Sequence, residues 1–141
     1  IMIQQTKEKK ILIIHGPNMN LLGHRFKETK TTITLDKLNR NLRKTARKFN
    51  INIKIIHTNN ESRAVTVLQR RRNKIYGIII FPGPWQQSGF VLKNTLEILK
   101  IPYITISLGE NVKLLKGIEN IKEEDIFKAC EIAINHLTKS I

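Results

Sequence analysis

The chain has 141 residues, of which 40% are hydrophobic, and this is enough for one domain with a buried core. Its one cysteine excludes an internal disulfide and a multi-cysteine zinc site, and no apolar run approaches the roughly 20 residues that span a bilayer. The 25 Lys and Arg residues exceed the 11 Asp and Glu residues, and the net charge of +14 indicates an anionic partner. A lone cysteine and an N-terminus without an apolar signal core favour a reducing, cytoplasmic compartment.

The order of the sequence patterns predicts an α/β domain. Residues 1–10 form a basic tail, and we expect residues 11–141 to fold as one domain. Five short β-branched runs predict strands at 11–15, 51–58, 76–81, 101–108 and 116–121. Apolar residues at helical spacing predict helices at 34–50, 61–72, 88–99 and 123–138. This alternation indicates a flavodoxin-like three-layer sandwich with a five-stranded parallel sheet.

Three segments follow predicted strands and are candidates for a ligand site. They are residues 15–25, 82–88 and 107–111. In open parallel sheets, ligands bind beyond the carboxyl ends of the strands, so these segments are expected to meet there. His15 ends the first strand and is a candidate lining residue of that cleft.

The motifs in these segments resemble those of the type II 3-dehydroquinate dehydratases along residues 11–108. The first motif agrees with that family at eight positions: Gly16, Pro17, Asn18, Asn20, Leu21, Leu22, Gly23 and Arg25. Later agreements are Thr34-Leu35, Asn59, Glu61, Pro82-Gly83 and Ile101-Pro102. The order and spacing of these matches imply the flavodoxin-like fold of the family.

The resemblance also implies an active site, which this sequence does not reproduce. In the family, a tyrosine polarised by an arginine abstracts a proton from dehydroquinate, and a His–Glu pair helps the hydroxyl leave. The positions of the family's Tyr, Asn, His, Glu, second His and distal Arg are occupied by Lys30, Phe81, Gln87, Thr105, Ser107 and Leu114. Asn18 and Arg25 remain, and neither can both abstract and deliver a proton. We therefore expect a catalytically dead relative in which Asn18 and Arg25 are vestigial. No cofactor is expected, nor a metal, because the four histidines lack the spacing of metal ligands.

Basic residues concentrate in the first 100 residues, which hold 20 basic and 5 acidic side chains, against 5 and 6 in residues 101–141. Those expected to contact phosphates lie in the tail, the first loop, the 34–50 helix and the end of the 61–72 helix: Lys7, Lys9, Lys10, Lys27, Lys30, Lys37, Arg40, Arg43, Lys44, Arg47, Lys48, Arg70, Arg71, Arg72 and Lys74. Right-handed crossovers would place the two helices on opposite faces of the sheet, giving two patches or a wrapped edge.

These features together predict a non-catalytic RNA-binding protein, a ribosomal or ribosome-associated structural protein that contacts rRNA phosphates and neighbouring ribosomal proteins. Aromatic residues make up 6% of the chain, which disfavours the reading of unstacked bases. No membrane partner is expected, and the high net charge disfavours the trimer-based dodecamers that the resemblance implies. Two alternatives remain open. One is an anion-binding protein or divergent dehydratase-like enzyme that uses the cleft at Arg25, and the other is a DNA-binding protein.

Overall fold

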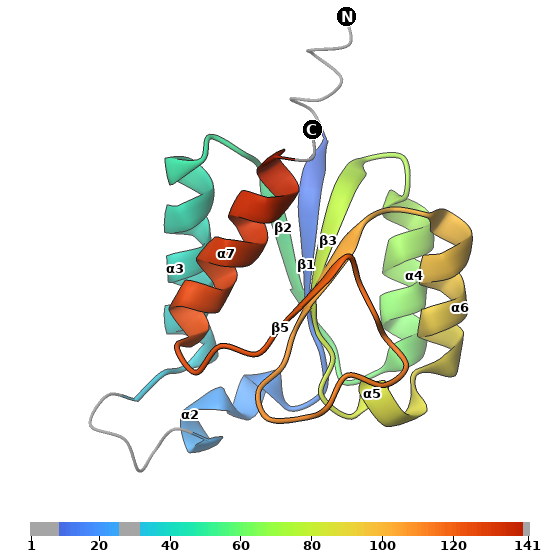
Figure 1. Cartoon of the computed structure of the whole chain (residues 1–141), viewed down its shortest axis with the longest axis horizontal. Coiled ribbons are helices and arrows are strands. Elements are labelled where there is room, and N and C mark those ends of the chain that lie inside the picture. Colours follow the sequence, from blue (N-terminus) through green and yellow to red (C-terminus); the bar gives the residue numbers. More distant parts are fainter. Residues whose placement is uncertain (1–8, 26–31, 140–141) are drawn as a thin grey trace, which may run out of the picture.

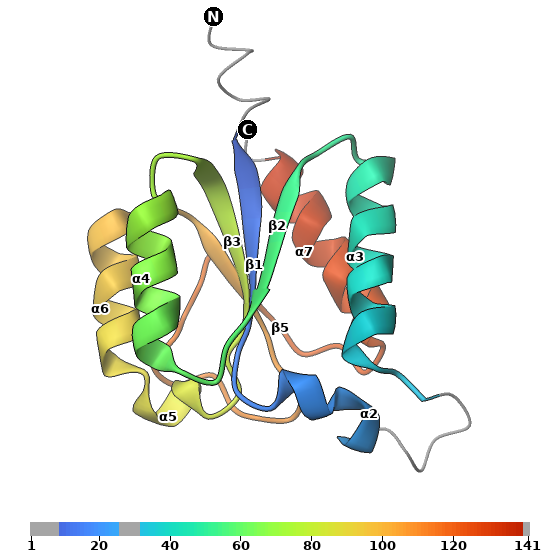
Figure 2. The same ribbon diagram turned by 180° about the vertical axis from the view of Figure 1, so that it is seen from behind.

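The computed structural model describes residues 9–25 and 32–139. Its centre is a parallel sheet between two layers of helices (Figures 1 and 2). The strands are β1 (Lys10–His15), β2 (Ile53–His57), β3 (Ile75–Phe81), β4 (Tyr103–Ile106) and β5 (Glu119–Ile121). Their order in the sheet is β2-β1-β3-β4-β5, which confirms the predicted flavodoxin-like three-layer sandwich with five parallel strands.

The long helices cover the sheet in pairs. One face carries α3 (Leu35–Lys48) and α7 (Ile126–Lys139), and the other carries α4 (Glu61–Arg71) and α6 (Phe90–Leu99) (Figures 1 and 2). The first two long helices therefore lie on opposite faces, as the crossover rule predicts. Three short helices lie at the carboxyl ends of the strands: η1 (Met19–Leu21), α2 (Leu22–Arg25) and α5 (Trp85–Ser88).

The apolar strands fill two cores because alternate side chains point to opposite faces of the sheet. In β1, Ile11 and Ile13 pack toward α3 and α7, whereas Leu12 and Ile14 pack toward α4 and α6. All four side chains are fully buried, which explains why this strand is a continuous apolar run. Cys130 of α7 belongs to the first core, where burial raises the pKa of its thiol to about 12. Cys130 is thus a small core residue.

Two long helices, α6 and α7, begin later than the sequence predicts, for local reasons. The helix expected at 88–99 begins at Phe90, because Ser88 ends the separate short helix α5 and Gly89, between the two helices, has a ψ of 52°, which is not helical. The last helix begins at Ile126 rather than at residue 123, because Asp125 Oδ1 accepts hydrogen bonds from the main-chain N–H groups of Phe127 and Lys128. The start of α3 is as predicted, with Thr34 Oγ1 accepting from Lys37 N at 3.2 Å.

Within residues 9–25 and 32–139, no helix is both long and apolar enough to cross a bilayer. The cytoplasmic compartment expected from the sequence stays a prediction. The expected boundary between a basic tail (1–10) and one domain (11–141) also stays a prediction, since residues 1–8 lie outside the described part of the chain.

Candidate functional site

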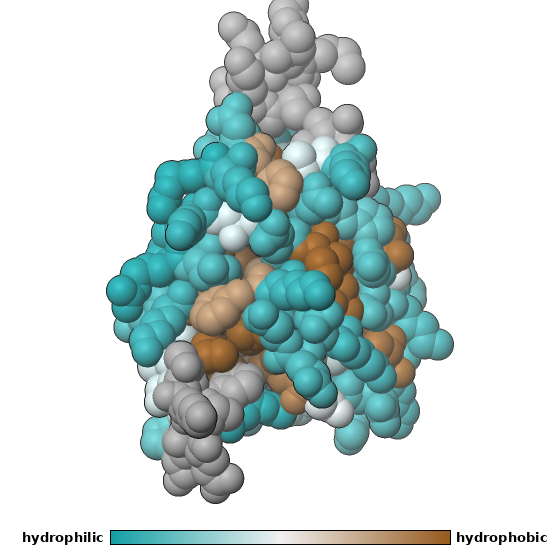
Figure 3. All heavy atoms as spheres, turned by 60° about the vertical axis from the view of Figure 1, so that its left-hand side comes forward, coloured by the Kyte–Doolittle hydropathy of each residue, from teal (hydrophilic) through white to brown (hydrophobic). Residues whose placement is uncertain are grey.

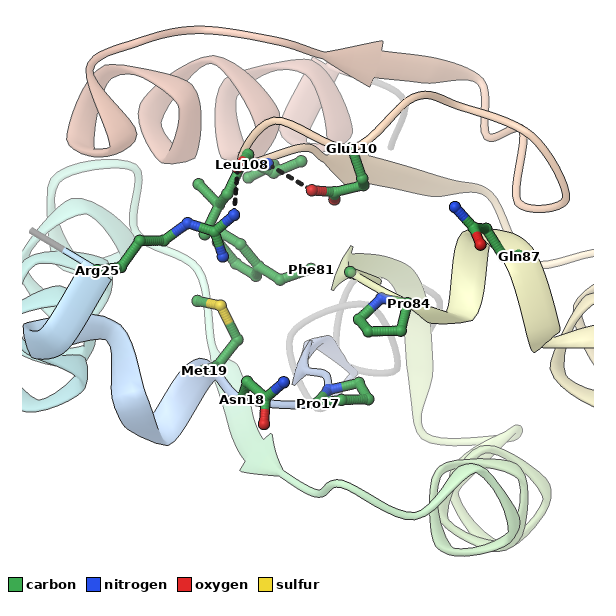
Figure 4. A pocket seen from close by; sticks show the side chains of 11 residues that line it. Pro17, Asn18, Met19, Arg25, Phe81, Pro84, Gln87, Leu108 and Glu110 are labelled. Carbon is green, nitrogen blue, oxygen red and sulfur yellow. Dashed lines mark hydrogen bonds between the residues drawn. The ribbon is translucent and has the colours of Figure 1, made fainter.

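A pocket of about 410 Å³ opens at the carboxyl ends of β1, β3 and β4 (Figure 4). Nine of its lining residues come from the three segments that the sequence predicts to meet: Pro17, Asn18, Met19, Arg25, Gly83, Pro84, Gln87, Leu108 and Glu110. The last residues of β3 and β4, Phe81 and Ile106, complete the lining. The prediction that these segments gather at one edge of the sheet is therefore confirmed. We call this cavity the strand-end pocket.

The charged side chains of the pocket lining, Arg25 and Glu110, are both held by the main chain of Leu108 (Figure 4). Arg25 Nη2 donates to the Leu108 carbonyl oxygen at 2.7 Å, and the Leu108 N–H donates to Glu110 Oε2 at 3.0 Å. Gly109, with a φ of +114°, lets the chain turn back between these two contacts. A guanidinium and a carboxylate are thus fixed beside one residue, with their remaining polar atoms available to a ligand.

Asn18 is placed in the pocket by an unusual backbone conformation. Its φ of 70° lies in the left-handed region, which asparagine tolerates better than most residues. Its main-chain N–H donates to Asn59 Oδ1 at 3.0 Å, so the segment after β2 anchors the segment after β1. Sequence analysis identified Asn59 as a family match without assigning it this supporting contact.

Only some of the residues that replace the family's catalytic side chains line the strand-end pocket. Phe81 is buried and Gln87 is exposed, and both line the strand-end pocket. Thr105 is fully buried and donates its hydroxyl to Asn120 Oδ1 at 2.7 Å, so it points into the fold. Ser107 is also buried, and its Oγ has no partner among the described residues. Neither it nor Leu114 lines this pocket, and Lys30 lies outside the described residues.

Sequence analysis missed Glu110, the carboxylate in the pocket lining. The signal was its place two residues beyond the strand predicted at 101–108, in a segment already expected at the site. A second pocket of about 440 Å³ shares Arg25, Leu108 and Glu110 with the first and adds Ser107, Gly109, Lys122, Glu123 and Glu124.

His15 does not line the strand-end pocket but lies behind it. It is fully buried, its ring centroid is 4.9 Å from that of the pocket residue Phe81, and its Nε2 is 2.8 Å from Asn39 Oδ1. Burial lowers the pKa of His15 to about 4; the Asn39 hydrogen bond raises it and nearby His57 lowers it further. The imidazole is therefore neutral at physiological pH and supports Phe81 from beneath.

The basic residues form separate groups rather than one surface. Those of α3 lie among the hydrophilic side chains on the side of the molecule that carries this helix: Lys37, Arg40, Arg43, Lys44, Arg47 and Lys48 (Figure 3). Arg70, Arg71, Arg72 and Lys74 lie at the end of α4, on the opposite layer. Lys9 and Lys10 begin the described chain, while Lys7, Lys27 and Lys30 fall outside it. Three of these cations have partners in the fold. Lys48 pairs with Glu131 at 3.0 Å, Lys37 Nζ donates to Thr32 O at 2.9 Å, and Arg72 Nη1 donates to Gln69 O.

Comparisons with known proteins agree with the motif matches. The family model for dehydroquinase class II matches residues 9–133. A 3-dehydroquinate dehydratase of Roseiflexus castenholzii is 37% identical over 100 residues, which are 71% of this chain and 64% of that protein. A 3-dehydroquinate dehydratase of Buchnera aphidicola subsp. Baizongia pistaciae is 37% identical over 99 residues, or 70% and 64% of the two chains. The matched part thus spans less than two thirds of the length of these relatives.

Solved structures show the same fold. The type II dehydroquinase from Propionibacterium acnes has a TM-score of 0.79 and 22% identity, and covers 93% of this chain and 97% of its own. The type II dehydroquinase from Butyrivibrio crossotus has a TM-score of 0.78 and 22% identity, with coverages of 92% and 97%.

These findings correct the function expected from the sequence. The expectation of a non-catalytic, RNA-binding ribosomal protein is wrong, because the matched relatives are named 3-dehydroquinate dehydratases. The expected rRNA and ribosomal-protein partners and the ribosomal location are wrong for the same reason. The expectation that this chain does not form the homo-oligomers of its family is wrong as well. The net charge of +14 is a property of the composition and does not by itself identify a polyanionic partner, and some of these cations have partners within the fold.

Proposed function

Because this chain belongs to the dehydroquinase class II family, we propose that it is a 3-dehydroquinate dehydratase whose substrate site is the strand-end pocket. The observation that carries the proposal is the meeting of Asn18 and Arg25, from the family motif, with the Glu110 carboxylate in one cavity (Figure 4). About 410 Å³ suits a small, hydroxylated carboxylate.

Removal of water from a β-hydroxy ketone needs a base for the proton next to the carbonyl, stabilisation of the enolate, and a proton for the departing hydroxyl. Glu110 is the acid–base group in this proposal, because its carboxylate lines the pocket and its Oε2 is held by the Leu108 N–H. The ionised carboxylate removes the proton, and its protonated form can then donate to the leaving hydroxyl. This role takes the place of the tyrosine and the His–Glu pair whose positions carry other residues here.

Arg25 binds the negative charge in this scheme. A guanidinium has five N–H donors, and one nitrogen of Arg25 is already fixed on the Leu108 carbonyl at 2.7 Å. The side chain is therefore oriented before the ligand arrives, and its remaining donors can hold a carboxylate or an enolate oxygen. The Asn18 amide adds a neutral hydrogen-bonding group, and Phe81 supplies an apolar wall that excludes water.

Three variants test these roles against the unmodified protein. The conjugated product of the elimination absorbs ultraviolet light, so turnover of 3-dehydroquinate can be followed directly. We expect Glu110→Gln to lower kcat by about 10²- to 10⁴-fold, the usual contribution of a general acid or base. Arg25→Ala should raise KM and lower kcat together. The matched control is Glu124→Gln, an exposed carboxylate of the second pocket, which should leave both constants unchanged.

Undiminished turnover by Glu110→Gln would overturn the assignment of the acid–base group. An unmodified protein that binds 3-dehydroquinate but releases no product would overturn the proposed activity itself.

A further inference from the structure

Gln86 is buried beside the strand-end pocket, with 1% of its surface exposed, yet it does not line the cavity. Its Oε1 accepts hydrogen bonds from the main-chain N–H groups of Lys113 at 3.0 Å and Leu115 at 2.8 Å. Its Nε2 donates to the Leu115 carbonyl oxygen at 3.0 Å. Its main-chain oxygen accepts from Leu114 N at 3.1 Å. Gln86 thus binds three consecutive residues of another segment.

That segment belongs to the irregular stretch between β4 and β5, which also carries Glu110. Its main-chain groups have no strand or helix to pair with, so the Gln86 amide satisfies them instead. Gln86 itself lies on α5, and its neighbour Gln87 lines the pocket, as Glu110 does (Figure 4). One buried amide therefore joins α5 to the stretch of chain that carries Glu110.

We propose that Gln86 is a positioning residue for the reaction: it fixes the 113–115 segment on α5 and thereby sets the place of the Glu110 carboxylate. The inference rests on the proposed function, because it acts through Glu110. A shift of about 1 Å in a catalytic group can lower the rate by about 10²-fold, so loss of this anchor should be visible in kcat.

The side chain must both accept and donate, and this makes the role testable with a near-isosteric change. Gln86→Leu removes every side-chain hydrogen bond of the anchor. Gln86→Glu keeps an acceptor for Lys113 and Leu115, but its ionised form has no hydrogen for the Leu115 carbonyl. When protonated, the introduced carboxyl can donate to that oxygen again. Burial raises the pKa of a carboxyl, so this recovery falls in an accessible pH range.

The experiment compares kcat, 3-dehydroquinate affinity by calorimetry, and amide hydrogen exchange in the unmodified protein and three variants. Gln86→Leu should lower kcat by about 10²-fold, weaken 3-dehydroquinate binding and expose the Lys113 and Leu115 amides to exchange. Gln86→Glu should resemble it at pH 8 and approach the unmodified protein at pH 5, measured relative to the unmodified protein at each pH. The control Thr95→Val removes another buried hydrogen bond, from Thr95 Oγ1 to Val91 O, away from the pocket, and should leave kcat unchanged.

Faster exchange at Lys113 and Leu115 with unchanged kcat and affinity in Gln86→Leu would overturn the positioning role and leave a purely structural one. Failure of the proposed function looks different, because the unmodified protein itself would then show no turnover. In that event the effect of Gln86→Leu on 3-dehydroquinate affinity still decides whether Gln86 shapes the pocket.

Discussion

Lowering the pH from 7 to 5 should destabilise this protein through His15. The imidazole is fully buried, and its Nε2 donates to Asn39 Oδ1, so Nδ1 is the unprotonated nitrogen. Nδ1 is buried and has no partner in the described structure. A proton added there would place a charge in the core without a hydrogen-bond acceptor, which explains why the pKa is lowered to about 4.

The size of the effect follows from the two pKa values. The unfolded chain binds the proton with a pKa of 6.5 and the folded protein with a pKa of about 4, so the unfolded state carries more protons between these values. The free energy of unfolding therefore falls as the pH falls through this window. At 1.36 kcal/mol per pH unit the full cost is about 3 kcal/mol, of which about 2 kcal/mol is lost between pH 7 and pH 5.

Urea unfolding followed by circular dichroism at pH 7 and pH 5 measures this loss. His15→Gln is the reference variant, because its amide can still donate to Asn39 but does not titrate. The unmodified protein should lose about 2 kcal/mol more than the variant between the two pH values. Equal pH dependence in the two proteins would refute the reasoning and show that His15 is protonated in the fold or exposed to water.

Two further substitutions test local features of the fold and the site. Gly89→Ala would place a Cβ 2.7 Å from the Trp85 carbonyl oxygen, so it should lower the free energy of unfolding in urea by about 1–3 kcal/mol. An unchanged urea midpoint would show that the backbone between α5 and α6 shifts to accept the methyl group without cost. Asn59→Ala removes the acceptor of the Asn18 N–H. It should lower the free energy of unfolding by about 1 kcal/mol and weaken 3-dehydroquinate binding. The control Asn73→Ala, at an exposed position, should change neither quantity. Equal binding by Asn59→Ala and the control would mean that Asn18 holds its place without this hydrogen bond.

The fold could be predicted from the sequence because its main signals are local. Continuous β-branched runs mark strands buried on both faces, and Thr34 marks the start of α3 through its own hydroxyl. The short helix α5 and the break at Gly89 escaped prediction, because the break is a non-helical backbone conformation of a single residue, with a ψ of 52°. A periodic pattern does not record such a conformation.

The location of the site could be predicted from the sequence, but not all of the side chains that act in it. The carboxyl-end rule brings Asn18, Arg25 and the segment after β4 together, and the structure confirms this. The roles proposed for Glu110 and Gln86 depend on the path of an irregular segment and on hydrogen bonds to main-chain groups. The sequence places Glu110 near the site but does not show these hydrogen bonds. The replaced family residues alone therefore predicted a loss of chemistry, whereas the fold brings the Glu110 carboxylate into the pocket.

The central claim is that the strand-end pocket removes water from 3-dehydroquinate. The most direct test is a time course with the purified, unmodified protein and 3-dehydroquinate, followed by ultraviolet absorbance and by mass spectrometry of the product. We predict saturable formation of a compound lighter than the substrate by one water, at a rate that Arg25→Ala strongly reduces. A product signal no faster than in the protein-free solution, at any concentration of protein, would contradict the claim.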